Sequence, residues 1–122
     1  MNGYNAYAAA MNNTEDPRST EYRLLGSVTG ALIRANTAEA SLQDRLNALL
    51  WNQQVWEAFL VDLSDEGNAL PQKLRASLTN LSLWIIKETD ALMDNGDDLE
   101  AMILINRNIM EGLRPSMSAA AE

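Results

Sequence analysis

Apolar residues recur every three or four positions along four segments of this chain, and no segment alternates apolar and polar residues for long. A spacing of three and four places side chains on one face of an α-helix, whereas alternation is typical of half-buried strands. The pattern therefore predicts helices throughout. Short connections between helices favour antiparallel neighbours. We expect an all-α fold, a small four-helix bundle-like domain with an N-terminal arm.

Proline and capping residues mark the predicted ends of the first two helices. Pro17 follows an aspartate that suits the N-cap, and proline is favoured at the first helical position, so we expect a helix over 17–35. A second helix is predicted over 36–65. Asn36 and Glu39 have the spacing of a capping box at its start, and a glycine follows its end.

Similar punctuation bounds the last two helices. A third helix is predicted over 71–94, with Gly96 as the residue that ends it. Asp97 and Glu100 have the spacing of a capping box for the fourth helix, and Pro115 ends that helix.

The same punctuation divides the chain into three parts. Residues 1–15 have no sustained period, and we expect an arm that is flexible or docked through Tyr4 and Tyr7. Residues 16–114 form the helical domain. Residues 115–122 are small and are expected to fray.

Composition argues against most kinds of chemistry. The 122 residues include no cysteine and no histidine, which removes thiol nucleophiles, the usual base at neutral pH and the commonest ligand of transition metals. Acidic residues outnumber basic ones 17 to 9, a net charge of −8. Phosphate contacts supply much of nucleic-acid affinity, so this charge argues against direct binding of DNA or RNA. We expect a protein that is not an enzyme and that holds no cofactor.

A membrane location is not expected either. No stretch approaches the roughly 20 apolar residues that cross a bilayer. The first residues carry no positive charge, unlike a signal peptide. The expected compartment is the cytoplasm.

Acidic residues cluster between 88 and 100, where a calcium loop is one hypothesis. With Gly96 as the glycine of such a loop, Ala91 and Met93 would occupy ligand positions and Met102 the position of the bidentate glutamate. We therefore expect solvated and helix-capping carboxylates and no metal site.

Apolar residues on the second helix exceed one core-facing stripe. Trp51 and Trp56 are five residues apart, about 140° around a helix. Trp56 continues a row of leucines and is expected in the core. Trp51 forms a separate strip with Val55 and Phe59. This strip is either covered by a second helix of the bundle, or it receives an amphipathic helix from a partner, or it forms a homodimer interface.

The fourth helix presents the same ambiguity. Ile105 and Met110 suit either a core or an adaptable binding surface. Asn106 interrupts an apolar run and needs hydrogen-bond partners. It either ties the helix to a loop or presents its amide to the backbone of a bound segment.

A series of short motifs runs along the chain in a fixed order. They are PRSTEYRLL (17–25), NQQVW (52–56), DL (62–63), NALP (68–71), LRA (74–76), LSLWI (81–85) and ILINRNIMEGL (103–113). In this order and at these spacings the chain resembles the FlaF family of flagellar biosynthesis regulators, from about Tyr4 to Leu113. The family usually carries basic residues at the positions of Gln53 and Gln54.

The resemblance implies a non-enzymatic cytoplasmic protein of bacterial flagellum biogenesis. It implies a chaperone that binds flagellin, delivers it to the export apparatus and works beside the translational regulator FlbT. Flagellin's terminal segments are amphipathic helices, and helix-in-groove binding would cover one of them. The alternative is a post-transcriptional regulator of flagellin mRNA that acts with FlbT. For the chaperone, the expected partner-binding residues are Tyr4 and Tyr7 of the arm, folded over the guest, Trp51, Val55 and Phe59 of the second helix, and Ile105, Asn106 and Met110 of the fourth.

Overall fold

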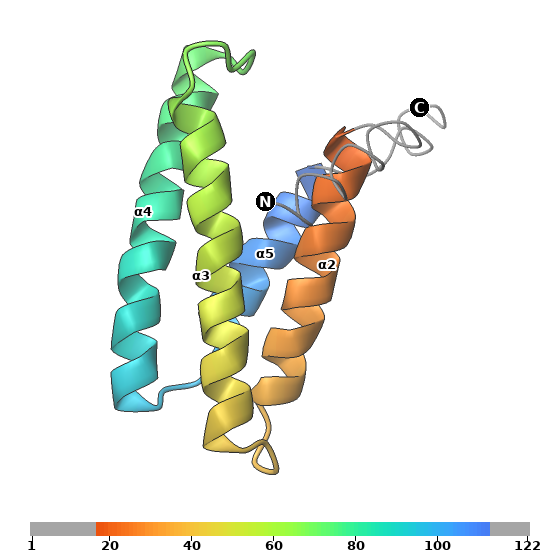
Figure 1. Ribbon diagram of the computed structural model, residues 1–122, viewed down its shortest axis with the longest axis vertical. Coiled ribbons are helices and arrows are strands. Elements are labelled where there is room, and N and C mark those ends of the chain that lie inside the picture. The colour runs from red at the N-terminus through yellow and green to blue at the C-terminus, as the bar shows by residue number, and fades with distance from the viewer. Residues whose placement is uncertain (1–16, 113–122) are drawn as a thin grey trace, which may run out of the picture.

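Four helices make up the part of the chain that the computed structural model describes, residues 17–112 (Figure 1). They are α2 (Pro17–Ala35), α3 (Leu42–Ser64), α4 (Gln72–Asn95) and α5 (Glu100–Gly112). These residues include no strand, and the predicted all-α bundle is confirmed. None of the described helices is long and apolar enough to cross a membrane. The predicted arm, the aspartate before Pro17 and the C-terminal tail lie outside the described residues.

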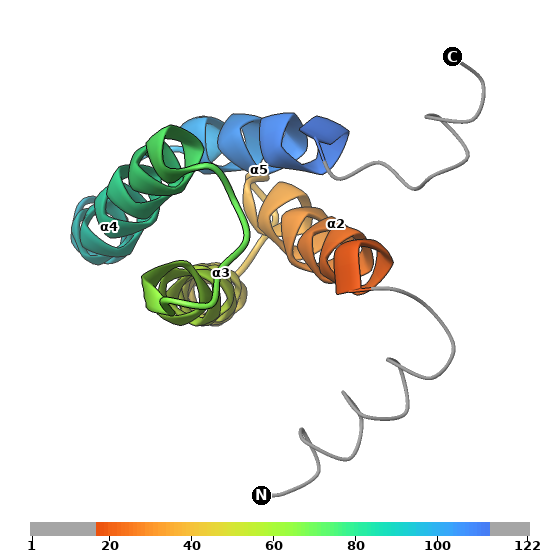
Figure 2. The same cartoon turned by 90° about the horizontal axis from the view of Figure 1, so that it is seen from above.

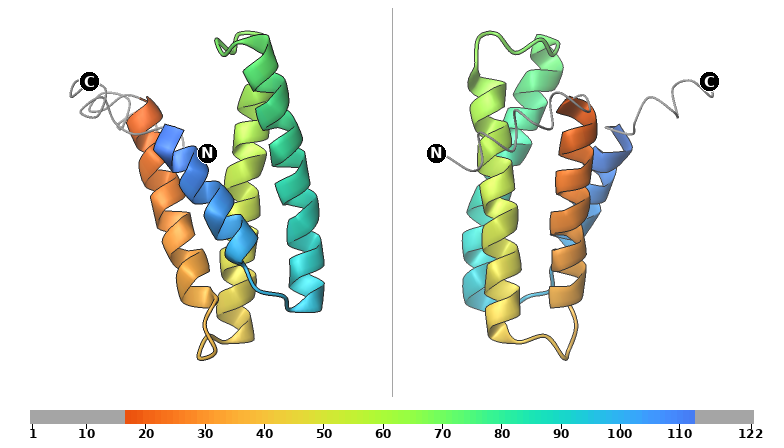
Figure 3. Two further views of the ribbon diagram at one scale, coloured as in Figure 1. Left: turned by 180° about the vertical axis from the view of Figure 1, so that it is seen from behind. Right: turned by 45° about the vertical axis from the view of Figure 1, so that its right-hand side comes forward.

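The helices form two pairs. α3 and α4 run antiparallel side by side, and α2 packs against both α3 and α5 (Figures 1 and 2). α5 starts near the foot of α4 and leans across to α2. The two pairs therefore diverge toward the end of the molecule that carries the connection 65–71 (Figure 3).

The predicted start of the second helix is wrong. α3 begins at Leu42, where the Ser41 hydroxyl accepts a hydrogen bond from the Asp44 N–H (3.0 Å). Asn36 does not cap its own helix. Its side-chain oxygen accepts from the backbone N–H of Leu99, 2.9 Å away and 63 residues later. The capping group is thus used to fix the start of α5 against the end of α2.

The capping box predicted at Asp97 is also wrong. The carboxylate of Asp98, the next residue, accepts from the Glu100 N–H (3.0 Å). The Asp97 N–H instead donates to the side chain of Asn95 (2.8 Å). Gly96 does end α4 as predicted, with a φ of 75°.

The left-handed backbone at Gly96 leads to a prediction on stability. Gly96→Ala should lower the free energy of unfolding by about 1 kcal/mol, because a Cβ disfavours this region and no atom lies within 4 Å of the new methyl group to compensate. Urea denaturation measures the change. Gly112→Ala is the matched control, since its Cβ also meets nothing within 4 Å and its φ is not positive. An equal loss in both variants would contradict the conformational explanation.

Two side chains of α3 join it to α4 and to the turn beyond. The Gln53 amide donates to the carbonyl of Ile86 (3.1 Å) and to the carboxylate of Asp90 (3.3 Å). The Arg45 guanidinium donates to the carbonyl of Leu92 (2.8 Å) and to a carbonyl in the following turn. Gln53 thus lies at the α3–α4 contact.

All four helices contribute to the core. Trp56 is 1% exposed, which confirms its predicted place. A smaller cluster of Leu25, Val28 and Val55 joins α2 to α3, with Phe59, Ile109 and Met110 packed at its edge. The main cluster comprises Leu32, Ala35, Ala48, Leu49, Trp56, Ile85, Leu92, Leu99, Met102 and Ile103.

Candidate functional site

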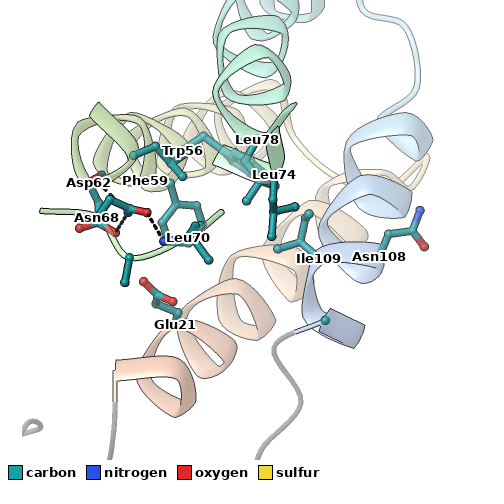
Figure 4. Close-up of a pocket in the computed structure, with 13 residues that line it drawn as sticks. Glu21, Trp56, Phe59, Asp62, Asn68, Leu70, Leu74, Leu78, Asn108 and Ile109 are labelled. Carbon is teal, nitrogen blue, oxygen red and sulfur yellow. Dashed lines mark hydrogen bonds between the residues drawn. The ribbon is translucent and has the colours of Figure 1, made fainter. Parts of the chain in front are cut away.

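An apolar groove lies where the two helix pairs diverge, with a volume of about 490 Å³ (Figure 4). It exists because α5 has 13 residues and α4 has 24, lengths of about 20 and 36 Å. The shorter helix cannot cover the α3–α4 pair along its full length. Apolar side chains from three helices and the 65–71 connection form the walls, chiefly Trp56, Phe59, Leu70, Leu74, Leu78 and Ile109.

Two leucines leave much of their apolar surface open to solvent. Leu70 is 39% exposed and Leu74 is 46% exposed. Leu78, one turn after Leu74, is half-buried and lines the same groove. Apolar area gains about 25 cal/mol for each Å² removed from water. Covering this wall with an apolar segment is therefore favourable.

A buried hydrogen-bond chain fixes the floor of the groove. The Trp56 indole N–H donates to the side-chain oxygen of Asn106 (3.0 Å), and the Asn106 amide donates to the side-chain oxygen of Asn52 (2.8 Å). All three residues are buried. The Phe59 ring packs edge-on against Trp56, with ring centroids 5.5 Å apart. Asn106 therefore ties α5 to helix α3 rather than to a loop, and its amide is engaged inside the protein.

The NALP motif folds the 65–71 connection onto the groove. The Asn68 amide donates to the backbone carbonyl of Asp62 (3.1 Å), and its side-chain oxygen accepts from the Leu70 N–H (3.0 Å). The Arg75 side chain donates to the carbonyl of Leu63 (2.7 Å), joining the start of α4 to the end of α3. These contacts place Leu70 beside Phe59 at the mouth of the groove (Figure 4).

A few polar groups line the rim. The carboxylates of Glu21 and Asp62 and the amides of Asn68 and Asn108 come from α2, α3, the connection and α5. An apolar cleft with a few polar groups at its edge is the usual form of a site that holds an amphipathic segment. No three acidic side chains in residues 17–112 come together as a metal site requires.

The structure separates the predicted strip on the second helix. Phe59 lines the groove. Val55 is buried beneath α2, whereas Trp51 is 37% exposed and lies beside Arg34 in a different depression. α2 thus covers Val55 in the middle of the strip, as in the alternative in which a second helix of the bundle covers it. Trp51 and Phe59, at the two ends of the strip, line two different depressions.

The predicted residues of the fourth helix lie mainly inside the molecule. Ile105 packs on the main core and Met110 on the smaller cluster, while Asn106 is fully buried. A Cβ at Gly26 of α2 would lie 3.5 Å from the Met110 methyl group, an ordinary van der Waals contact, so the packing of Met110 does not require a glycine there. Tyr4 and Tyr7 lie outside the described residues. Whether these side chains contact a partner stays a prediction.

Sequence reasoning missed four residues of the groove, Leu70, Leu74, Leu78 and Ile109. Leu74 and Leu78 are four residues apart, which in sequence is the spacing of a core-facing stripe of the predicted third helix. The one available signal was Leu70, a leucine between an alanine and a proline in a connection, where no helix requires it.

Comparison with known proteins identifies the family. The family model described as "Flagellar protein FlaF" matches residues 4–113, most of the chain. No curated protein and no solved structure matches the chain. The matched range includes every residue that lines the groove. The chain therefore belongs to the FlaF family of flagellar proteins.

Proposed function

We propose that this protein is a cytoplasmic chaperone that binds flagellin in the groove and promotes its synthesis and export during flagellum assembly. Family membership supports a flagellar role. The observation that carries the binding mode is an apolar groove with two half-exposed leucines over a rigid floor. The guest is an amphipathic terminal segment of flagellin, which carries apolar side chains at helical spacing.

The shape of the groove supports capture of a single helix. Leu74 and Leu78 are four residues apart on α4 and face Ile109 of α5 across the opening (Figure 4). A guest helix with apolar residues at i, i+3 or i+4, and i+7 would place each between these walls. The few polar groups at the rim would set its orientation.

Energetics favour reversible binding. Each apolar anchor buried contributes about 1.5–3 kcal/mol, while folding a disordered segment on binding costs about 2–5 kcal/mol. The balance leaves weak, reversible binding, which allows transfer of flagellin to the export apparatus or to FlbT.

Calorimetric titration of the full chain with full-length flagellin tests the proposal. Truncated flagellins that lack either terminal segment identify the guest. We expect binding that is lost with one truncation and kept with the other. Absence of binding by full-length flagellin at tens of micromolar would overturn the proposal.

A further inference from the structure

We propose that residues 4–11 of this chain form a short helix that occupies the groove when no partner is bound. Tyr4 and Tyr7 are its anchors. The docking is independent of what the groove binds. Only its consequence, competition with flagellin, rests on the function proposed above. The segment then covers the exposed leucines and blocks the site until a guest displaces it.

The first argument is the place where this segment joins the fold. α2 begins at Pro17, and Glu21, one helical turn later, lines the groove. Four residues of helix rise about 6 Å, so the chain enters α2 at the edge of the groove. Residues 12–16 span up to about 17 Å when extended, which lets the preceding segment turn back across the opening.

The second argument is the pattern of the segment. Tyr4, Tyr7, Ala8 and Met11 have the spacing i, i+3, i+4 and i+7, which places them on one face of a helix. The intervening alanines favour helix formation. Two turns alone are too short to be stable in water, so such a helix needs a surface to pack on.

The third argument is the chemistry of the two surfaces. Tyrosine joins a large apolar ring to a hydroxyl group that seeks a partner. The groove offers apolar walls at Phe59, Leu74 and Ile109, with acceptor oxygens at its rim. Asp62 is one such acceptor, because within residues 17–112 its carboxylate receives only a long contact of 3.4 Å from Asn68.

The C-terminal segment is the competing occupant, because Gly112 also lines the groove. That segment has a proline at 115, and its only large apolar side chains are Leu113 and Met117. The family model begins at residue 4 and ends at residue 113. It therefore includes the whole of the proposed helix and almost none of the C-terminal segment.

Disulfide trapping in the full chain tests the docking directly, since the protein has no cysteine of its own. Tyr7→Cys combined with Leu74→Cys should form an intramolecular disulfide under mild oxidation. Leu83→Cys replaces Leu74→Cys in the control, because Leu83 is 51% exposed on α4 outside the groove. Equal trapping of both pairs overturns the proposal. The proposal is also overturned if Met117→Cys forms a disulfide with Leu74→Cys faster than Tyr7→Cys does.

Tyr7→Asp in the full chain tests the competition. If the segment covers the groove nine-tenths of the time, its release should tighten flagellin binding about tenfold. Weaker binding would show that Tyr7 folds over the guest and would overturn the competition. A trapped disulfide in a protein that binds no flagellin would leave the docking standing and refute the proposed function.

Discussion

Leu74→Asp should abolish measurable binding of flagellin in a calorimetric titration and leave the helical fold intact. Leu74 is 46% exposed and forms one wall of the groove. Its replacement places a carboxylate where the guest must bury apolar surface. Burying an unpaired charge costs several kcal/mol, and 3 kcal/mol already raises the dissociation constant about a hundredfold. Leu74 belongs to neither core cluster of the described helices, so the stability of that fold should change little.

Leu83→Asp is the matched control for this prediction. Leu83 lies on the same helix, is similarly exposed and does not line the groove. Its replacement should leave flagellin affinity within a factor of about two, as is usual for a surface change. Equal losses for the two variants would show that α4 as a whole, and not the groove, determines binding. Phe59 is a poorer position for the test, because its ring also packs on buried Trp56.

Helical periodicity predicted the elements well because it depends on neighbours three and four residues apart. Trp56 followed the leucine row and lies in the core. Leu42 belongs to the same row but is 69% exposed, at the first position of α3. The pattern identifies a face of a helix but not the length over which a neighbour covers that face.

The helix start predicted at Asn36 was wrong because the partner of Asn36 is distant in sequence. Asn36 and a glutamate three residues later fit a local capping box, yet Asn36 caps α5 through Leu99. A local sequence pattern cannot show whether a side chain will cap its own helix or will bond to a backbone group 63 residues away. Asn106 shows the same limit, since its need for partners was clear but their identity was not.

The groove could not be predicted from the sequence for a related reason. It results from unequal helix lengths and from the lean of α5 toward α2 (Figure 2). Residues of a core stripe line a groove wherever the opposite helix diverges from them. Leu74 and Leu78 are therefore indistinguishable in sequence from Leu92, which is buried.

Asn106→Leu should strongly destabilise the fold through the floor of the groove. The leucine has a similar size, but it leaves the Trp56 indole N–H and the Asn52 side-chain oxygen buried without the partner they have now. Each orphaned group costs about 1–3 kcal/mol, so we expect a loss of about 3–4 kcal/mol in the free energy of unfolding. Urea denaturation followed by tryptophan fluorescence measures it.

The controls for this variant separate the hydrogen bonds from the packing of α5. Asn108→Leu, at an exposed position two residues later, should change stability by less than about 0.5 kcal/mol. Trp56→Phe removes the orphaned donor, so it should cost less in the Asn106→Leu background than in the wild type. Strict additivity of the two changes would contradict a coupled network. Coupling would mean that one hydrogen-bond chain both holds α5 against α3 and fixes the indole in the floor of the groove, so that the groove keeps its shape only while α5 stays docked.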